Sequence, residues 1–306
     1  MLKLAYLYTH SELTPWKENV NEETLAFLVE HTPESIQSEV VHFDGFTPEV
    51  LARLRTFDLV FNLSYGYETA GQVEVAAWLE QHGIRHTASR KEAMALAQDK
   101  GRLPEICRVL GLRTPAIYYA LSDLNPDIVY IAKPRMGSCH RNISIDTGLN
   151  LGLALSGEED LIIQPYISGR EFSVAVIPDS LGSENIALPP IEIEPENKGA
   201  IYIAGQLMGK TSRNFCPELD DTQRTDLMAQ ALALHKYIGL SGMSRTDFRM
   251  DERGRIYALD VNAMPNMDPK RSLLPALCQY HGVEIGELIR RVVLGQVPVA
   301  VSVALD

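Results

Sequence analysis

The sequence predicts a mixed fold, in which an α/β unit is followed by an α+β unit. Two apolar runs rich in strand-forming residues, at residues 2–8 and 58–63, enclose a helical segment at residues 22–30 and give a β-α-β start. From residue 128 the pattern changes to short strand-like runs separated by glycine-containing turns, which indicates an antiparallel sheet. The 306 residues include 45% hydrophobic and 22% charged residues, as in globular proteins, and the length allows about two domains.

The remaining elements follow from periodicity and from residues that end helices. We expect one helix over residues 71–82, ended by Gly83, and another over residues 91–110, with Gly111 as its C-cap. Residues 197–217 show no clear period, and loops of this length in a compact domain are often functional lids. The other expected elements are strands at residues 128–134, 142–145, 160–166, 170–177, 184–195, 244–250 and 255–261, and helices at residues 220–238, 273–280 and 284–294.

Charge and hydropathy argue against several classes of partner. The chain has 28 Lys and Arg against 40 Asp and Glu, a net charge of −12, which repels nucleic-acid phosphates and anionic lipid surfaces. The most apolar stretch, residues 292–305, is too short for a bilayer, which takes about 20 apolar residues. The amino terminus reads as a strand, and the four cysteines are widely spaced. We therefore expect a cytoplasmic protein with reduced thiols and with neither a nucleic-acid nor a membrane partner.

Four polar residues converge on two strands joined by a tight turn. Alternation places Arg245 and Asp247 on one face of the first strand, and Asp260 and Asn262 on one face of the second. Hard divalent cations such as Mg²⁺ take carboxylate and amide oxygens, and such sites often serve nucleotide chemistry. The alternative is an exposed hairpin face with its charges in water. We favour a metal site because Asp260 and Asn262 interrupt an apolar strand, where polar groups are otherwise costly.

Three weaker signals point to phosphate and nucleotide binding. Lys133 ends a strand and leads into a short Gly-Ser loop, an arrangement that holds phosphate by charge and by backbone N–H groups. Residues 164–167 form an extended segment before Glu171, so their backbone could read an adenine edge while the carboxylate accepts hydrogen bonds from a ribose. Lys100, in the run AQDKGRLPE, reads in isolation as a solvated helix lysine. Taken alone, Lys133 is better explained by a surface hairpin turn and Lys100 by a solvated helix, and the signal at residues 164–171 is weak.

Together, the order and spacing of these signals resemble the ATP-grasp superfamily, in the branch of D-alanine:D-alanine ligase and related carboxylate-amine ligases. The matching motifs are VFNL-x-x-G, DK at Asp99 and Lys100, GLRTP, AKP-x-x-GS, QPYISGRE, FCP, R-x-D-F from Arg245, and D-x-N-x-x-P from Asp260. The resemblance covers most of the chain from Asp58 onward. It implies a three-part ATP-grasp fold, with an N-terminal α/β domain at residues 1–90, a central domain at 91–175 and a C-terminal domain at 176–306. ATP would lie between the last two.

The resemblance also implies roles for single residues. ATP and Mg²⁺ are the implied cofactors, with Mn²⁺ as an alternative metal, and the number of metal ions stays open. Asp260 stands where the family more often has Glu, and its shorter side chain alters the scope for bidentate coordination. Lys100 and Lys133 correspond to the phosphate-binding lysines, Ser138 to the flap over the phosphates, Gln164, Pro165, Tyr166 and Ile167 to the adenine-binding segment, Glu171 to the ribose ligand, Asp247, Asp260 and Asn262 to the magnesium ligands, and Arg245, with Lys133 and Ser138, to the catalytic groups.

The implied reaction joins a small-molecule carboxylate to an amine through an acyl phosphate, and it needs no protein nucleophile. Its chemistry depends on positioning and on cations that neutralise developing negative charge. A non-catalytic ATP-binding sensor or scaffold is a different class of function, but such a protein has no need of Arg245. The oligomeric state stays open, with a homodimer as one option because related ligases are often dimers.

Departures from the family pattern concern the substrate side. The loop expected to carry a Lys-Tyr pair has Gln206 and Leu207, and the family's Pro-Gly becomes Pro265-Asn266. These changes favour a ligase of specialised metabolism acting on amino acids or similar molecules, with the cell-wall D-alanine:D-alanine ligase as the alternative. The residues predicted to contact substrate are Glu12, Lys210, Arg213 and Ser272.

Overall fold

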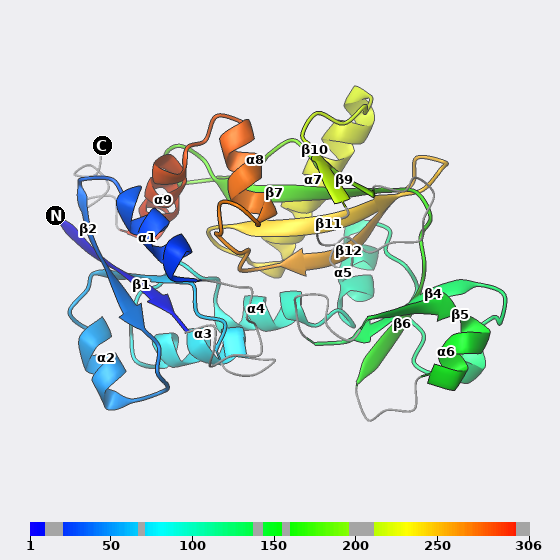
Figure 1. The fold of residues 1–306 in the computed structure, drawn as a ribbon, viewed down its shortest axis with the longest axis horizontal. Helices are drawn as coiled ribbons and strands as arrows, with labels where there is room; N and C mark the ends of the chain where they lie inside the picture. Colours follow the sequence, from blue (N-terminus) through cyan, green and yellow to red (C-terminus); the bar gives the residue numbers. More distant parts are fainter. Residues whose placement is uncertain (10–20, 67–70, 137–142, 155–159, 196–210, 298–306) are drawn as a thin grey trace.

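The computed structural model describes residues 1–9, 21–66, 71–136, 143–154, 160–195 and 211–297 (Figure 1). The described strands form three sheets, one parallel and two antiparallel, which follow one another along the chain. The predicted mixed fold is therefore confirmed.

The first sheet is parallel and has its earliest strand in the middle. Its central strand is almost fully buried, as expected for a strand that pairs on both edges and is covered on both faces. Asn21 caps the first helix by accepting a hydrogen bond from the N–H of Thr24. In the order β2-β1-β3, the strands are β1 (Leu2–Tyr8), β2 (Ile36–His42) and β3 (Leu59–Asn62), and the helices are α1 (Glu22–Glu30), α2 (Pro48–Leu54) and α3 (Gly71–Gln81).

Two short helices, α4 (Lys91–Gln98) and α5 (Leu103–Leu110), replace the single helix expected over residues 91–110, so that prediction is wrong. The break arises because the Asp99 carboxylate accepts hydrogen bonds from the N–H of Gly101 at 2.9 Å and from Arg135. Gly111 ends α5 in the left-handed conformation with φ 69°, as predicted.

The second sheet is antiparallel, with the order β5-β4-β6, and it has a small core of its own. Tyr130, Leu151 and Ile163 belong to this core. One helix of this region, α6, is absent from the elements expected from the sequence. The elements are η2 (Leu121–Asp123), β4 (Val129–Pro134), β5 (Ser144–Thr147), α6 (Gly148–Ala154) and β6 (Leu161–Pro165).

The third sheet is antiparallel and runs in the order β10-β9-β7-β11-β12, with β8 also paired to β7. Helices pack on its central strand, and their apolar residues share one continuous core with the first sheet and α4. Asp220 and Gln223 form a capping box at the start of the longest helix. The elements are β7 (Arg170–Pro178), β8 (Asn185–Ala187), β9 (Ile191–Pro195), β10 (Thr211–Asn214), α7 (Asp221–Ile238), β11 (Ser244–Met250), β12 (Ile256–Asn262), α8 (Leu273–Tyr280) and α9 (Ile285–Leu294).

The strands expected to form one antiparallel sheet thus divide between two sheets. The chain passes from the second to the third sheet at residues 166–169, whereas the predicted domain boundary at residue 175 lies inside β7. The three domain ranges stay a prediction, and the topology favours the earlier position for this boundary. Part of the expected loop at residues 197–217 forms β10, and residues 196–210 lie outside the described ranges. Within the described ranges, no helix combines the length and apolar character that a bilayer span demands.

Candidate active site

The hairpin of β11 and β12 brings together the four polar residues that the sequence analysis places on it. Arg245 lies opposite Asn262, and Asp247 lies opposite Asp260. The pairing register between β11 and β12 shifts after Asp247, which marks an irregularity in the strand pairing next to the polar residues. Alternation along two paired strands therefore gathers two carboxylates, an amide and a guanidinium at one end of the third sheet.

Arg245 and Asp247 form a two-pronged ion pair within β11. Arg245 donates from Nε to Asp247 Oδ1 at 3.0 Å and from Nη2 to Oδ2 at 2.9 Å, and the Ser173 hydroxyl of β7 also donates to Oδ1. Burial lowers the pKa of Arg245, but the charges of Asp247 and Asp260 outweigh it and hold that pKa above its usual value. The guanidinium is therefore a permanent cation in this site.

Two lysines approach the same end of the hairpin from other elements. Lys100, between α4 and α5, has its Nζ 4.0 Å from Asp260 Oδ1, and its side chain is 10% exposed. Lys133, on β4, donates from Nζ to the carbonyl oxygen of Leu259 at 3.4 Å. Burial lowers the pKa of Lys133 to about 8, with Asp260 opposing the shift and Lys100 adding to it. The site thus collects three cations around two carboxylates.

The position of Lys100 depends on an ion pair that links α4 to β4. Arg135 donates from Nε and Nη2 to both carboxylate oxygens of Asp99, at 2.7 and 2.8 Å. The N–H of Lys100 donates to the Arg135 carbonyl oxygen at 3.1 Å. These hydrogen bonds to Arg135 lower the pKa of Asp99, which stays ionised. Asp99 and Arg135 therefore fix Lys100 against the end of β4, a function that the DK motif alone did not reveal.

The segment predicted to bind adenine joins the second and third sheets. Gln164 and Pro165 end β6, and the Gln164 side chain is buried and donates to the Pro115 carbonyl oxygen at 3.3 Å. The N–H of Tyr166 donates to the Val129 carbonyl oxygen at 2.9 Å. Ile167 follows, outside any strand. The Gln164 side chain serves the fold, so any contact with a nucleotide base falls to the backbone of this segment.

Glu171, the predicted ribose ligand, is buried on β7 and forms an ion pair with Arg249 of β11 at 2.8 Å. Burial raises the pKa of Glu171, and Arg249 opposes that shift. Arg249 is missed by the sequence analysis because an arginine in a strand pattern usually reads as a solvent-exposed residue. Ser173 is missed for a similar reason, since a lone serine in an apolar strand carries no signal.

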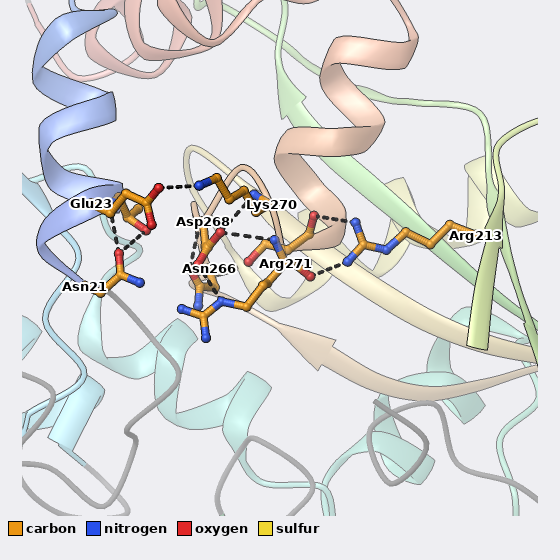
Figure 2. Close-up of polar contacts among 9 residues, drawn as sticks. Asn21, Glu23, Arg213, Asn266, Asp268, Lys270 and Arg271 are labelled. Atoms are coloured by element: carbon orange, nitrogen blue, oxygen red, sulfur yellow. Dashed lines mark hydrogen bonds and ion pairs between the residues drawn. The ribbon is translucent and has the colours of Figure 1, made fainter. Parts of the chain in front are cut away.

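Arg213 and Ser272, two predicted substrate contacts, meet at the loop before α8. Figure 2 shows Arg213 extended toward Arg271 of this loop. Arg213 reaches from β10 and donates to the carbonyl oxygens of Ser272, at 3.5 Å, and of Arg271. Asp268 folds this loop by accepting from the N–H groups of Lys270 and Arg271, at 2.9 and 3.1 Å. The structure therefore pairs Arg213 with the Ser272 backbone.

Figure 2 also shows Lys270 extended toward Glu23 of α1, with which it forms an ion pair. The loop before α8 is thus tied to the first helix of the chain. A second link from the N-terminal region is the Tyr65 hydroxyl, which donates to the Met264 carbonyl oxygen at 2.8 Å. Three predicted residues, Glu12, Ser138 and Lys210, lie outside the described residues, as do Gln206 and Leu207.

The donor set of the hairpin suits a hard divalent cation. Asp247, Asp260 and Asn262 offer only oxygen donors, which Mg²⁺ prefers. Among the described residues, no group of three or more His, Cys, Asp or Glu side chains is arranged to hold a metal, so the Asn262 amide is needed to complete a set of three. Asn262 Oδ1 accepts from the N–H of Met264 at 3.1 Å, which orients the amide while a second lone pair remains.

Comparison with known proteins identifies the family to which the chain belongs. Residues 146–294 match the family model described as D-ala D-ala ligase C-terminus. The chain is 30% identical to the D-alanine–D-alanine ligase of Marinomonas sp. (strain MWYL1) over 253 residues, 77% of this chain and 76% of that protein. The fold superposes on D-alanine–D-alanine ligase from Bacillus anthracis with a TM-score of 0.76 at 19% identity, covering 97% of both chains. The same enzyme complexed with ATP gives a TM-score of 0.72 at 18% identity, again covering 97% of both chains.

The fold and these matches define an ATP-grasp enzyme, an ATP-dependent ligase of the peptide-forming type. The chain belongs to the D-alanine–D-alanine ligase family. ATP and Mg²⁺ are the cofactors of this family, as the sequence resemblance implies.

Proposed function

We propose that this protein is a D-alanine–D-alanine ligase, which joins two D-alanine molecules at the expense of ATP. The observation that carries the ligase chemistry is the arrangement of Lys100, Lys133 and Arg245 around Asp247 and Asp260. The choice of D-alanine is supported by the curated relative, which matches across three quarters of its length. The comparisons thus favour the cell-wall alternative over the specialised ligase that the substrate-side departures suggested.

In this proposal the nucleotide lies between the second and third sheets. Lys100 and Lys133 bind its phosphates by charge, because both amines approach one end of the site from separate elements. The backbone at Tyr166 and Ile167 reads the base, and Glu171 accepts hydrogen bonds from the ribose. Gln164 and Pro165 contribute by ending β6 at the right place. Ser138 keeps its predicted role in the flap over the phosphates.

Asp247, Asp260 and Asn262 would hold Mg²⁺, with Mn²⁺ as the alternative metal. Bound there, the ion supplies positive charge that neutralises phosphate oxygens. Asp247 is already paired with Arg245, so its carboxylate is ionised and oriented before any ligand arrives. The Ser173 hydroxyl adds a second constraint on the same carboxylate.

The reaction follows from this charge distribution. A substrate carboxylate oxygen bonds to the γ-phosphorus of ATP, the bond from that phosphorus to the bridging oxygen breaks, and ADP leaves. The amine nitrogen of the second substrate then bonds to the acyl carbon, phosphate leaves, and the nitrogen loses a proton. Arg245 neutralises the oxyanion that forms at the acyl carbon, and Lys133 neutralises the transferred phosphoryl group. The residues act by position and charge, without a covalent bond to the protein.

A ligase with a different acceptor is a second candidate, favoured by the loop before α8. Arg213 already donates to two backbone carbonyls there, and Asn266 takes the place of the family's glycine. A site built around other polar groups rejects a substrate that leaves them unpaired. Glu12, Lys210, Arg213 and Ser272 keep their predicted substrate contacts in both candidates. The homodimer and the cytoplasmic location stay predictions.

The test is a coupled assay of ADP release with D-alanine as the sole amino acid, followed by mass spectrometry of the product. D-Alanyl-D-alanine should form with one ADP per dipeptide, and Arg245→Met should slow the appearance of both products by about 10²- to 10³-fold. A panel of other D-amino acids and D-hydroxy acids serves as the comparison. Faster ADP release with another acceptor, together with negligible dipeptide from D-alanine, would transfer the assignment to the second candidate.

A further inference from the structure

Arg249 is a buried cation at the point where the chain passes from the second sheet to the third. It belongs to β11 and lies opposite Glu171 of β7, and its side chain is only 2% exposed. A charge buried to this degree is retained in proteins only with partners that compensate it. Three contacts of Arg249 join it to the segment that the proposed function assigns to the nucleotide.

The guanidinium of Arg249 makes three different contacts with that segment. Its Nη2 donates to Glu171 Oε2 at 2.8 Å, and its Nη1 donates to the Ile167 carbonyl oxygen at 2.9 Å. Its carbon Cζ lies 4.5 Å from the centre of the Tyr166 ring, which is a cation–π distance. One planar group thus touches a carboxylate, a backbone carbonyl and an aromatic face.

The chain between these partners is held from both sheets. On the side of the second sheet, the N–H of Tyr166 donates to the Val129 carbonyl oxygen at 2.9 Å. On the side of the third sheet, Gly169 has φ +131°, and a Cβ added there would lie 2.1 Å from the Met250 carbonyl oxygen. Residues 166–169 are therefore packed against the residue that follows Arg249 as well as against its side chain.

We propose that Arg249 is a positioning residue for the nucleotide, which fixes residues 166–169 and orients the Glu171 carboxylate, and so sets the affinity for ATP. This inference rests on the proposed function, because it takes residues 164–171 as the nucleotide segment. The planar fork of arginine suits the task, since its donors point in fixed directions while its face stacks. Because the Ile167 carbonyl accepts from Arg249, the base is read by other backbone groups of the segment.

The choice of variant has to separate positioning from charge compensation. Replacing Arg249 by Met leaves Glu171 buried without its cation, which is strongly destabilising in itself. Arg249→Lys keeps the positive charge beside Glu171 but cannot bond Glu171 and Ile167 in one plane while stacking on Tyr166. If Arg249 only compensates the charge of Glu171, lysine should preserve ATP binding. If the planar guanidinium positions the segment, lysine should not preserve it.

The experiment measures the dissociation constant of ATP by calorimetry and the steady-state kinetics of the full chain. We expect Arg249→Lys to raise both the ATP dissociation constant and KM for ATP at least about tenfold, because a hydrogen bond from a charged group is lost. At saturating ATP, kcat should stay within about twofold of wild type. The variant weakens binding equally in the ground state and in the transition state, and it removes no contact made only in the transition state. Arg253→Lys, at the exposed turn of the same hairpin, is the matched control and should change neither value.

A second comparison keeps the test valid should the lysine variant not fold. The single variant Glu171→Gln keeps the Arg249 guanidinium, whereas the double variant Glu171→Gln with Arg249→Met lacks it. Neither variant leaves a buried carboxylate unpaired. The double variant should bind ATP more weakly than the single one. Equal ATP dissociation constants in either comparison, or a loss of kcat with unchanged ATP binding, would overturn the inference.

The outcome for the proposed function is read separately. A wild-type protein that binds ATP but makes no dipeptide would refute the D-alanine assignment while leaving the comparison of dissociation constants intact. A wild-type protein with no measurable ATP binding would refute both.

Discussion

Arg245 occupies both carboxylate oxygens of Asp247, so a cation that binds Asp247 competes with a guanidinium for the same two atoms. If a metal cation displaced Arg245 from this pair, the guanidinium would become available to the phosphates of the nucleotide. In the two-pronged pair, the arginine is held ready at low conformational cost, because its rotamer is already fixed. Binding of a cation to Asp247 would therefore determine whether Arg245 is available to the phosphates.

Arg245→Met is expected to lower kcat by about 10²- to 10³-fold, the usual cost of removing one donor to a transition-state oxyanion. KM for ATP should change much less, because the contact is made chiefly in the transition state. The Mg²⁺ concentration for half-maximal activity should not rise, since Asp247 loses its competitor. Steady-state kinetics with varied ATP and Mg²⁺ check this, with the exposed Arg90→Met as control. Parallel tenfold losses in ATP binding and kcat would contradict a transition-state role.

Asn262→Ala is expected to raise the Mg²⁺ concentration needed for half-maximal ATP turnover by at least about tenfold, since loss of even an outer-shell partner often costs 10- to 100-fold. The fold should persist, because Asn262 lies at the end of β12, where its side-chain oxygen accepts a hydrogen bond from the N–H of Met264. Asn185→Ala, on β8, is the matched control. The measurement is ATP turnover against Mg²⁺ concentration, with circular dichroism to confirm folding. A wild-type Mg²⁺ profile would refute the metal assignment.

Features encoded by contiguous patterns could be predicted from the sequence. The strand Leu2–Tyr8 and the helix Glu22–Glu30 have the predicted bounds, because a run that is apolar except for Lys3, and an Asn cap, each act locally. Alternation across one tight turn also predicts that Arg245, Asp247, Asp260 and Asn262 gather on one hairpin. Their direct pairing, Arg245 with Asn262 and Asp247 with Asp260, depends in addition on the register shift after Asp247, which alternation does not predict.

Features decided by distant partners could not be predicted. The ion pair that Asp99 forms at the end of α4 has its partner, Arg135, 36 residues away, and the ionic partner of Glu171, Arg249, lies 78 residues further along. Strand β2 was missed because its sequence IQSEVVH mixes buried and exposed positions at the edge of a sheet, without the apolar run of β1. Such residues acquire a role only once the sheets are assembled.

Lys133→Met is expected to weaken ATP binding by about 10- to 100-fold, the range for losing a hydrogen bond from a charged donor. The same change should leave the melting temperature equal or higher, because the pKa of about 8 shows that burial disfavours the ammonium. Calorimetric titration with ATP and thermal unfolding measure the two effects, with Lys236→Met as control. A large fall in melting temperature would mean that Lys133 stabilises the fold. It would contradict the expectation that this lysine serves ATP binding without stabilising the folded chain.

His235 gives the fold a specific sensitivity to acid. Its side chain is fully buried on α7, Nδ1 lies 2.7 Å from the Ser244 hydroxyl oxygen, and Nε2 has no hydrogen-bond partner among the described residues. Burial, with a smaller contribution from Lys236, lowers the pKa of His235 to about 4. In the doubly protonated ring both nitrogens carry a hydrogen, so the one on Nε2 would have no acceptor among the described residues.

The unfolded chain binds a proton at His235 near pH 6.5, whereas the folded chain binds it only near pH 4. Between these values the unfolded state holds more protons, so the free energy of unfolding falls as the pH drops and levels off below about 4. The full difference from this one residue is about 3 kcal/mol, by the conversion of 1.36 kcal/mol for each pKa unit. Above pH 6.5 the residue contributes no pH dependence.

His235→Gln removes the titrating group while an amide can still bond the Ser244 hydroxyl. Urea unfolding at a series of pH values from 7.5 to about 4 should show a shallower loss of stability for the variant than for wild type, with the two curves converging in slope above pH 6.5. The exposed His31→Gln serves as the matched control and should follow the wild-type curve. Parallel curves for wild type and His235→Gln between pH 6.5 and 4 would show that this imidazole does not govern the acid response, and would shift attention to the ion-paired carboxylates such as Asp99.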